Sequence, residues 1–300
     1  MAMRPIAAWV FAGFLSTLAF AGEAVTESGL TAAQIVEKNV AARGGLEAWR
    51  KIQTMVWVGH VETANAAMSG MPFVLELKRP DKTRFEIRAQ NQVSARIFDG
   101  SHGWKLHPTG NGRPGVQPYT SEELKLARDG QVIDGPLIDY EAKGNAVALD
   151  GVDEVEGRKA YRLNVKIPSG VGHHVWVDAE TFLDIKSDRV SHNAFGQSGT
   201  VVMYYRNYRT IEGIQIPSMI ETGGDTTKAT DKMVIDKIAL NPPLEDRTFA
   251  KPSVPGQRHV VSVGADPVPM TRRAAPQIPS LPPRLSRPPP EAAPGSVGGQ

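Results

Sequence analysis

The segment FVLELKRPDKTRFEIRAQNQVSARI, residues 73–97, decides the fold class of this chain. Apolar and polar side chains alternate along three short runs within it, which is the period of a half-buried β-strand. The turn-forming sequences Arg79-Pro80-Asp81-Lys82 and Gln90-Asn91 separate the runs. The segment therefore predicts three antiparallel strands joined by tight connections, each with one apolar face.

The same alternation continues on both sides of this segment. One strand is predicted before it, over residues 55–61. Seven more are predicted after it, over 147–155, 161–167, 172–178, 183–191, 200–208, 214–221 and 227–238. The polar stretch 109–118 is interpreted as a break between the two groups. The chain is therefore predicted to be mainly β, with about eleven strands.

Helical patterns are few and short. Thr31 can cap a helix that ends at Gly44-Gly45, and residues 46–52 read as a further helical turn. Residues 121–128 predict a capped helix, and residues 136–139 a short helical turn. So few helices cannot cover the apolar face of eleven strands. The sheet must pair with itself as a sandwich, close as a filled barrel, or curl round a cavity, and periodicity leaves all three open.

The largest apolar side chains on the strands form one candidate set. By strand parity they fit either an ordinary core or the lining of an apolar cavity, and the alternation by itself favours a core. The set is Trp57, Phe73, Leu75, Leu77, Phe85, Ile87, Ile97, Trp104, Leu163, Val165 and Met203.

The N-terminus has the pattern of a signal peptide. Arg4 gives a positive start, residues 6–18 are almost wholly apolar, and Ala19-Phe20-Ala21 is a typical cleavage site. Residues 1–21 are therefore predicted to be removed, and the mature protein is expected in a bacterial periplasm. The chain has no cysteine, so neither a disulfide nor a thiolate metal site can support the fold.

The C-terminal segment differs from the rest of the chain. Residues 251–300 hold twelve of the 23 prolines and no aromatic residue, which predicts a disordered tail. The tail is read as a spacer, a ligand for an envelope partner, or an inert end. Residues 22–250 then form one domain, which carries 27 basic and 30 acidic residues. A surface so close to neutral argues against nucleic-acid binding.

Four short motifs occur in series along the domain: residues 35–49 at the first helix end, Phe98-Asp99-Gly100 with Gly103-Trp104, residues 177–183, and Tyr208-Arg209 with residues 213–217. Together they resemble the outer-membrane lipoprotein-sorting (LolA-like) family over about residues 30–250. This resemblance implies an incomplete, half-open antiparallel β-barrel of about eleven strands with a few plug helices. It also implies an apolar cavity that shields acyl chains, so the candidate set is assigned to the cavity lining.

The resemblance implies a function without catalysis. A monomeric periplasmic carrier would bind an acylated lipid or lipoprotein and transfer it towards the outer membrane, between an inner-membrane donor and an outer-membrane acceptor. No cofactor and no metal is expected, because each buried methylene contributes about 0.8 kcal/mol to binding. The alternative is a non-transporting envelope sensor or interaction module that uses the same cavity.

Two groupings of reactive residue types offer other interpretations. His173-His174 with Asp178 and His192 contains metal-ligand types, but adjacent residues on a strand point to opposite faces. Ser191-His192 with Asp188 contains the types of a nucleophilic triad on one predicted strand, without a nucleophile elbow. An envelope-lipid hydrolase is therefore a third and weaker interpretation. The basic residues between 78 and 96 are interpreted mainly as a solvated strand face, with contact to lipid head groups as the alternative.

Overall fold

A computed structural model describes residues 29–63, 69–89, 92–109, 114–130, 133–192, 198–224 and 231–253. The chain divides into two units, residues 1–256 and 257–300, and every described residue belongs to the first. The predicted signal peptide, the tail and the turn at Gln90-Asn91 lie outside the described residues. Among the helices that are described, none has the length and apolar character needed to cross a membrane.

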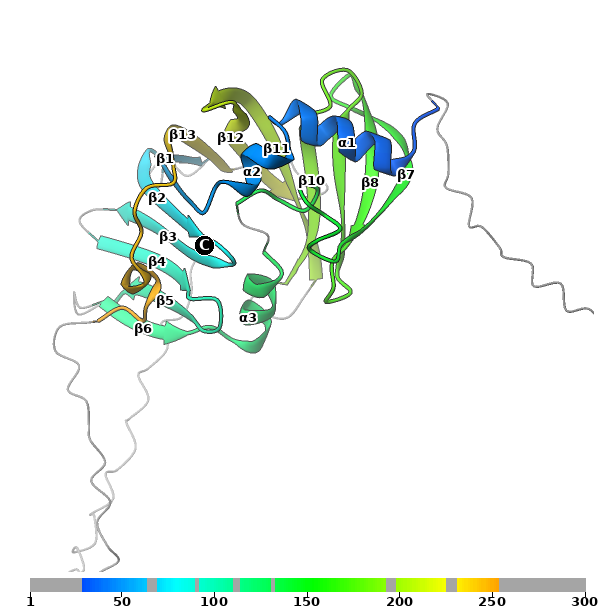
Figure 1. The fold of residues 1–300 in the computed structure, drawn as a ribbon. Coiled ribbons are helices and arrows are strands. Elements are labelled where there is room, and N and C mark those ends of the chain that lie inside the picture. Colours follow the sequence, from blue (N-terminus) through cyan, green and yellow to red (C-terminus); the bar gives the residue numbers. More distant parts are fainter. Residues whose placement is uncertain are drawn as a thin grey trace, which may run out of the picture. The chain divides into compact units, whose positions relative to one another are not determined.

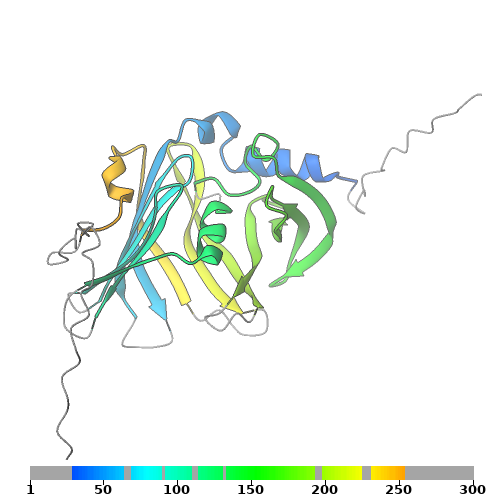
Figure 2. The same ribbon diagram turned by 90° about the horizontal axis from the view of Figure 1, so that it is seen from below.

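The described residues form one antiparallel sheet of thirteen strands, in the order β6-β5-β4-β3-β2-β1-β13-β12-β11-β10-β9-β8-β7. The sheet curls without closing, so β6 and β7 are its two edges (Figures 1 and 2). This confirms the predicted half-open antiparallel architecture. The strands are β1 Thr54–Thr63, β2 Met71–Lys78, β3 Lys82–Ala89, β4 Gln92–Phe98, β5 Gly103–Pro108, β6 Pro114–Pro118, β7 Ala146–Val155, β8 Arg158–Lys166, β9 Gly172–Asp178, β10 Asp184–His192, β11 Ser198–Ile211, β12 Ile214–Gly224 and β13 Asp231–Leu240.

Four short helical elements accompany the sheet: α1 Ala32–Ala42, α2 Leu46–Arg50, α3 Ser121–Arg128 and the 3₁₀ turn η2 Asp246–Phe249. Thr31 caps α1 as predicted, and Gln34 completes a capping box. Residues 136–139 are not helical but form turns, so that prediction is wrong. Figure 1 shows α3 between the two edges of the sheet, where the barrel is open.

The two strands beyond the predicted eleven are β5 and β6. Residues 114–118 were predicted to lie in a polar break, but they form β6 and pair with β5. The prediction is wrong because prolines at 114 and 118 argue against an interior strand, whereas an edge strand tolerates them.

The strand register defines the concave face of the first arm of the sheet, which comprises β1–β6. Trp57 lies opposite Leu75, and Leu75 lies opposite Phe85. Directly opposed residues share a face, so these three side chains form one apolar row. Phe73 and Ile87 form the next row along the same strands.

The register corrects the predicted face of Ile97 and Trp104. Ile97 lies opposite Arg84, and Trp104 lies opposite Ile97, so both side chains are on the convex face. η2 crosses the same face over β2 and β3: Lys78 bonds Asp246, and the Arg84 guanidinium donates to the carbonyl oxygen of Thr248. Apolar alternation reports burial on either side of a sheet, and here η2 provides cover outside.

Two clusters on the concave face make up most of the core. One packs Ile35 and Val36 of α1 on Leu163, Val165 and other residues of the second arm, β7–β10. The other packs Trp49 of α2 on Leu77 of the first arm and on Ile216 of β12. The strands β11–β13 join the two arms, and the clusters leave a space between them.

Gly44 brings the α1–α2 corner against the β11–β12 hairpin. Its φ is +108°, and a Cβ at this position would lie 2.4 Å from the carbonyl oxygen of Gly213. The backbone N–H of Gln215 also donates to the carbonyl of Arg43. The glycine predicted to end the helix therefore also sets the distance between the helices and the sheet.

Candidate functional site

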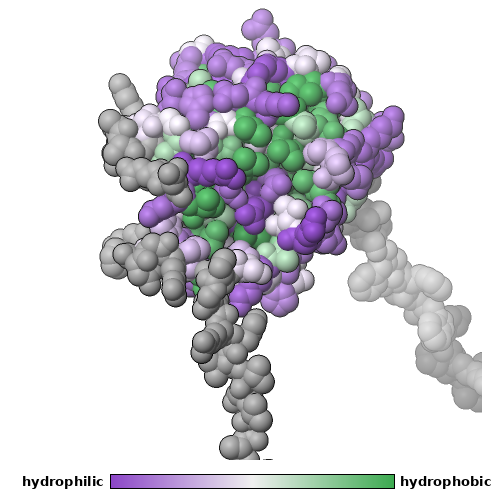
Figure 3. Space-filling model, turned by 90° about the vertical axis from the view of Figure 1, so that its left-hand side faces the viewer, coloured by the Kyte–Doolittle hydropathy of each residue, from purple (hydrophilic) through white to green (hydrophobic). Residues whose placement is uncertain are grey.

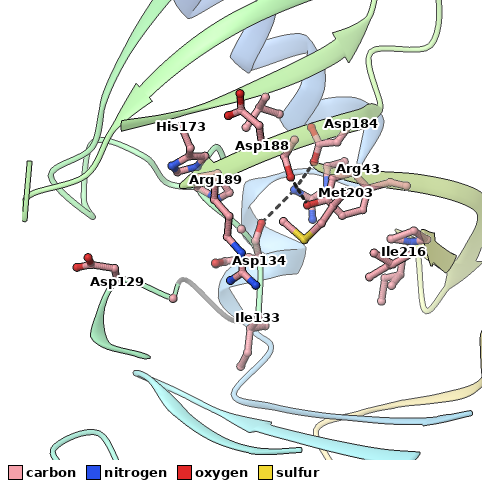
Figure 4. Close-up of a pocket in the computed structure, with 18 of the residues that line it drawn as sticks. Arg43, Asp129, Ile133, Asp134, His173, Asp184, Asp188, Arg189, Met203 and Ile216 are labelled. Carbon is pink, nitrogen blue, oxygen red and sulfur yellow. Dashed lines mark hydrogen bonds and ion pairs between the residues drawn. The ribbon is translucent and has the colours of Figure 1, made fainter. Parts of the chain in front are cut away.

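A pocket of about 370 Å³ opens on the concave face between the two core clusters (Figure 4). Its walls come from β1, β9, β10, β11 and β12, from the corner between α1 and α2, and from residues within 126–130 and 133–136. The apolar lining includes Trp49, Trp57, Val175, Met203, Ile216 and Ile220.

The strand register explains why these residues meet. Met203 lies opposite Ser187 on one side and Thr222 on the other, and Tyr205 lies opposite Ile220. These side chains project from alternate positions of neighbouring strands to the concave face. The sheet therefore presents successive rows across the pocket, each with apolar and hydroxyl-bearing side chains.

Leu126 of α3 faces the pocket from the open side of the barrel. It lines the pocket and is 41% exposed. Glu123 anchors the helix by accepting hydrogen bonds from Arg96 and Lys105 of the first arm. α3 therefore places an uncovered apolar side chain at the pocket entrance.

The closed end of the pocket contains a buried ion pair. Arg43, at the end of α1, lies 3.3 Å from the Asp184 carboxylate and stacks 4.7 Å from the Trp49 ring centre. Its guanidinium also donates to the carbonyl of Asp134. Asn39 donates to the other Asp184 oxygen at 2.9 Å. The pair therefore ties the plug helix to β10 at the base of the pocket.

Burial dominates the electrostatics of this pair. It raises the pKa of Asp184 above the ordinary value, while Arg43 and the Asn39 amide oppose the rise. Burial also raises the pKa of Tyr208, whose hydroxyl donates to the Asp184 backbone carbonyl. These groups bond to one another inside the protein, although Asn39 Oδ1 and Arg43 Nε are buried without a hydrogen-bond partner among the described residues.

A hydroxyl pair lies one step nearer the entrance. The Tyr205 hydroxyl and Ser187 Oγ are 2.8 Å apart. Burial raises the pKa of Tyr205, so the phenol stays protonated at neutral pH. The hydroxyls lie on the same face as Met203 and make that wall partly polar.

Arg189 and His173 line the end of the pocket away from Asp184. Figure 4 shows the Arg189 side chain extending from β10 into the pocket. Burial lowers the pKa of His173, an effect that Asp188 opposes, so the imidazole is neutral at pH 7.

The segment 133–135 forms one rim. Asp134 is buried and pairs with both Arg79 and Lys143, which fixes the segment to the first arm. On its other side lies a second pocket of about 590 Å³, lined mainly by polar residues that include Gln53, Asp81 and Arg128.

The structure separates the predicted lining residues into four groups. Trp57 and Met203 line the pocket. Leu75, Phe85 and Ile87 are half-buried and continue the concave face from Trp57. Four others are buried. Leu163 and Val165 lie in the α1 cluster, Leu77 lies in the Trp49 cluster, and Phe73 is buried on the concave face outside both. Ile97 and Trp104 lie on the convex face, as described above. Ligand binding by the concave residues stays a prediction.

The sequence interpretation missed several lining residues. Ile216 and Ile220 fall in a predicted strand, and strand parity could have identified them. Arg43 and Asp184 are 141 positions apart, and no local pattern signals their contact. Leu126 lies on a mainly polar helix whose position only the tertiary structure defines.

The predicted histidine grouping is divided between the two faces of the sheet. His173 points into the pocket, whereas His174 contacts Asp150 and Asp188 on the convex face. Asp178 accepts hydrogen bonds from its own turn and pairs with Arg158. The side chains of Ser191 and His192 lie outside the described part of the chain. Within that part, no three His, Asp or Glu side chains are grouped to hold a metal ion.

A second apolar surface lies on the convex side of β1 and β2. Val58 is 40% exposed there and lies opposite Val74. Figure 3 shows hydrophobic residues gathered among hydrophilic ones on this side of the molecule. Val58 therefore matches Leu126 in exposure but lies on the face away from the pocket.

No family model and no curated protein sequence matches the chain significantly. Among solved structures, the fold is similar to that of a LolA superfamily protein from Nitrosomonas europaea, with 18% identity and a TM-score of 0.48, over 74% of this chain and 98% of that chain. An outer membrane lipoprotein-sorting protein domain from Vibrio parahaemolyticus gives 13% identity and a TM-score of 0.46, over 72% and 95% of the two chains. A DUF1329 family protein from Desulfovibrio piger gives 13% and 0.46, over 73% and 97%.

Proposed function

We propose that this protein carries an acylated lipid or lipoprotein, whose acyl chain occupies the pocket on the concave face. The observation that carries the proposal is an apolar pocket with an uncovered leucine, Leu126, at its entrance. An exposed apolar wall in a concave site marks a place where a ligand removes apolar surface from water.

The size of the pocket supports this proposal. A volume of about 370 Å³ lies in the range of ligand-binding pockets, which is roughly 300–1,000 Å³. Each methylene buried there contributes about 0.8 kcal/mol. The half-buried row Leu75–Phe85 extends from Trp57 and offers further apolar surface to a longer chain.

The polar groups of the pocket support binding rather than catalysis. Ser187 is the pocket hydroxyl with a nucleophile's chemistry, but it shares its hydrogen bond with Tyr205. No imidazole bonds to it among the described residues, and a serine nucleophile needs such a base. Asp184 is likewise engaged by Arg43 and Asn39.

The proposed setting follows from the sequence. A cleaved signal peptide over residues 1–21 would deliver the carrier to the periplasm, where it would move its ligand from an inner-membrane donor towards the outer membrane. Release requires that α3 or the plug helices move, or that a receptor offers a better cavity. We propose that the carrier acts as a monomer without a cofactor.

The test compares two aliphatic side chains of nearly equal exposure, Leu126 and Val58. Titration of the mature protein with a fluorescent fatty acid should show saturable binding, which Leu126→Gln weakens and Val58→Gln leaves unchanged. Equal effects of both variants, or no binding by the wild type, would overturn the proposal.

A second measurement separates the carrier from the sensor alternative. Loaded protein is mixed with acceptor vesicles, and the transfer of the fluorescent acyl chain is followed with time. A carrier delivers its ligand to the vesicles. Retention of the ligand, together with binding of an envelope protein only in the loaded state, would instead favour a sensor.

A further inference from the structure

Among the described residues, one cation of the pocket lining, Arg189, has no acidic partner. Arg43 is paired with Asp184, but Arg189 has no ion pair or hydrogen bond with any described residue. Its side chain is exposed and extends from β10 into the mouth of the pocket (Figure 4). An arginine presents five N–H donors in a planar fork suited to carboxylate and phosphate oxygens.

The register places Arg189 at one end of the apolar rows. It lies opposite Val201, two residues along β10 from the Ser187–Met203 pair. Five positions separate it from Asp184 at the closed end, which is at most about 17 Å at the rise of an antiparallel strand. Between the two ends lie the rows that contain Met203, Ile220 and Trp57. Apart from the Ser187–Tyr205 hydroxyl pair, the wall between the two ends is therefore mainly apolar, and a cation lies at the outer end.

His173 lies beside this end on β9. It lines the pocket, and it forms no hydrogen bond with the described residues. A neutral imidazole has one N–H donor available for a ligand oxygen without adding charge. Arg189 and His173 together offer donors from two neighbouring strands.

The acidic side chains around the pocket leave this cation free. Asp134 is paired with Arg79 and Lys143, and Asp188 is paired with His174 on the convex face. Asp129 is the remaining carboxylate of the lining, and Figure 4 shows it directed away from Arg189. No carboxylate of the described residues lies within ion-pair distance of the Arg189 guanidinium.

We propose that the pocket selects an anionic amphiphile, whose carboxylate or phosphate group binds Arg189 beside His173 while its acyl chain runs along the apolar rows towards Trp57. This inference rests on the proposed function, and it specifies the ligand class. A fatty acid or a phospholipid carries the required oxyanion, whereas a neutral acyl ester does not.

The test compares a fatty acid with its methyl ester, which has the same chain and no charge. The wild type should bind the ester about tenfold more weakly, the effect of losing a hydrogen bond to a charged group. Arg189→Gln should weaken binding of the acid about tenfold and leave the ester unchanged, and Arg189→Lys should restore part of the preference. Lys186→Gln is the matched control, because Lys186 is on the same strand but lies over Trp176 on the convex face.

Each outcome is decisive. Equal affinity for acid and ester, or a preference that survives Arg189→Gln, overturns the inference and leaves the proposed carrier intact. Binding of neither probe overturns both. Inorganic phosphate is added as a competitor to separate an amphiphile site from a simple anion site. Displacement of the fatty acid by phosphate at millimolar concentration would show that the anion alone is recognised, and would also overturn the inference.

Discussion

The two arms of the sheet carry similar apolar rows but cover them differently. In the second arm, Leu163 and Val165 are fully buried under α1. In the first arm, Leu75 and Phe85 on the corresponding concave face remain half-buried, because α2 is short and reaches only the Trp49 cluster. The comparison teaches that strand alternation defines an apolar face, whereas the helices decide whether that face becomes core or binding surface.

The largest effect is expected at the link between α1 and the sheet. Arg43→Ala should cost about 3–5 kcal/mol of folding stability, because it leaves the Asp184 carboxylate buried without its partner. Urea denaturation measures the loss. Arg50→Gln removes an exposed arginine paired with Asp139 and should cost much less. Equal losses would show that the Arg43 pair does not hold the covered arm together.

Two alanine substitutions compare the covered core of the second arm, at Leu163, with the wall of the pocket, at Ile220. Removing the fully buried Leu163 side chain should cost about 2–5 kcal/mol of stability, with little change in the affinity for a fatty acid. Ile220→Ala, in the half-buried pocket wall, should show the opposite pattern, with a smaller stability loss and weaker binding. Thermal denaturation and fluorescence titration measure the two quantities. A binding loss confined to Leu163→Ala would reverse the assignment of covered core and pocket wall.

Leu75 and Val74 are adjacent on β2 but point to opposite faces of the sheet, so substitutions at these two positions test the two faces separately. Leu75→Glu places a charge on the concave apolar row and should lower fatty-acid affinity at least about tenfold. Phe85→Glu should act in the same way. Val74→Glu makes the same change on the convex face and should leave binding unchanged. Circular dichroism checks that each variant is folded. Normal binding by folded Leu75→Glu and Phe85→Glu would exclude this row from the site.

The smallest effect concerns the attachment of α3 to the first arm. Although burial opposes it, the Thr120 backbone N–H, Lys105 and Arg96 lower the pKa of Glu123 to about 2. Because this pKa lies below the ordinary value of 4.5, the carboxylate stabilises the fold above pH 4.5, and its contribution is lost as the pH falls towards 2. Wild type should exceed Glu123→Gln in stability by less than about 1 kcal/mol at pH 7, since the group is partly solvated. The difference should vanish near pH 2, and a difference independent of pH would contradict the assignment.

Local patterns predicted much of the fold. The alternation in residues 73–97, the Thr31 cap and the Gly44 helix end all have local causes, and each is found in the structure. The errors also have physical causes. The prolines of β6 argued against a strand that an edge position tolerates, and the apolar parity of β4 was assigned to the concave face although the register puts it on the convex one.

Sequence patterns predicted the residues of the candidate site less completely than they predicted the fold. Trp57 and Met203 were named because large apolar residues recur with strand parity. The same criterion named Leu163 and Val165, which α1 covers completely. Parity cannot separate these cases, because it contains no information about which helix lies above which strand.

The sequence by itself determined an antiparallel sheet with one apolar face per strand and too few helices to cover it, since these properties depend on neighbouring residues. Only the tertiary structure decided which parts of the apolar face the helices cover. The position of α1 over the second arm, the contact of Arg43 with Asp184 and the direction of Arg189 join segments that are far apart in the chain. Such contacts depend on the packing of the whole domain, and no local pattern encodes them.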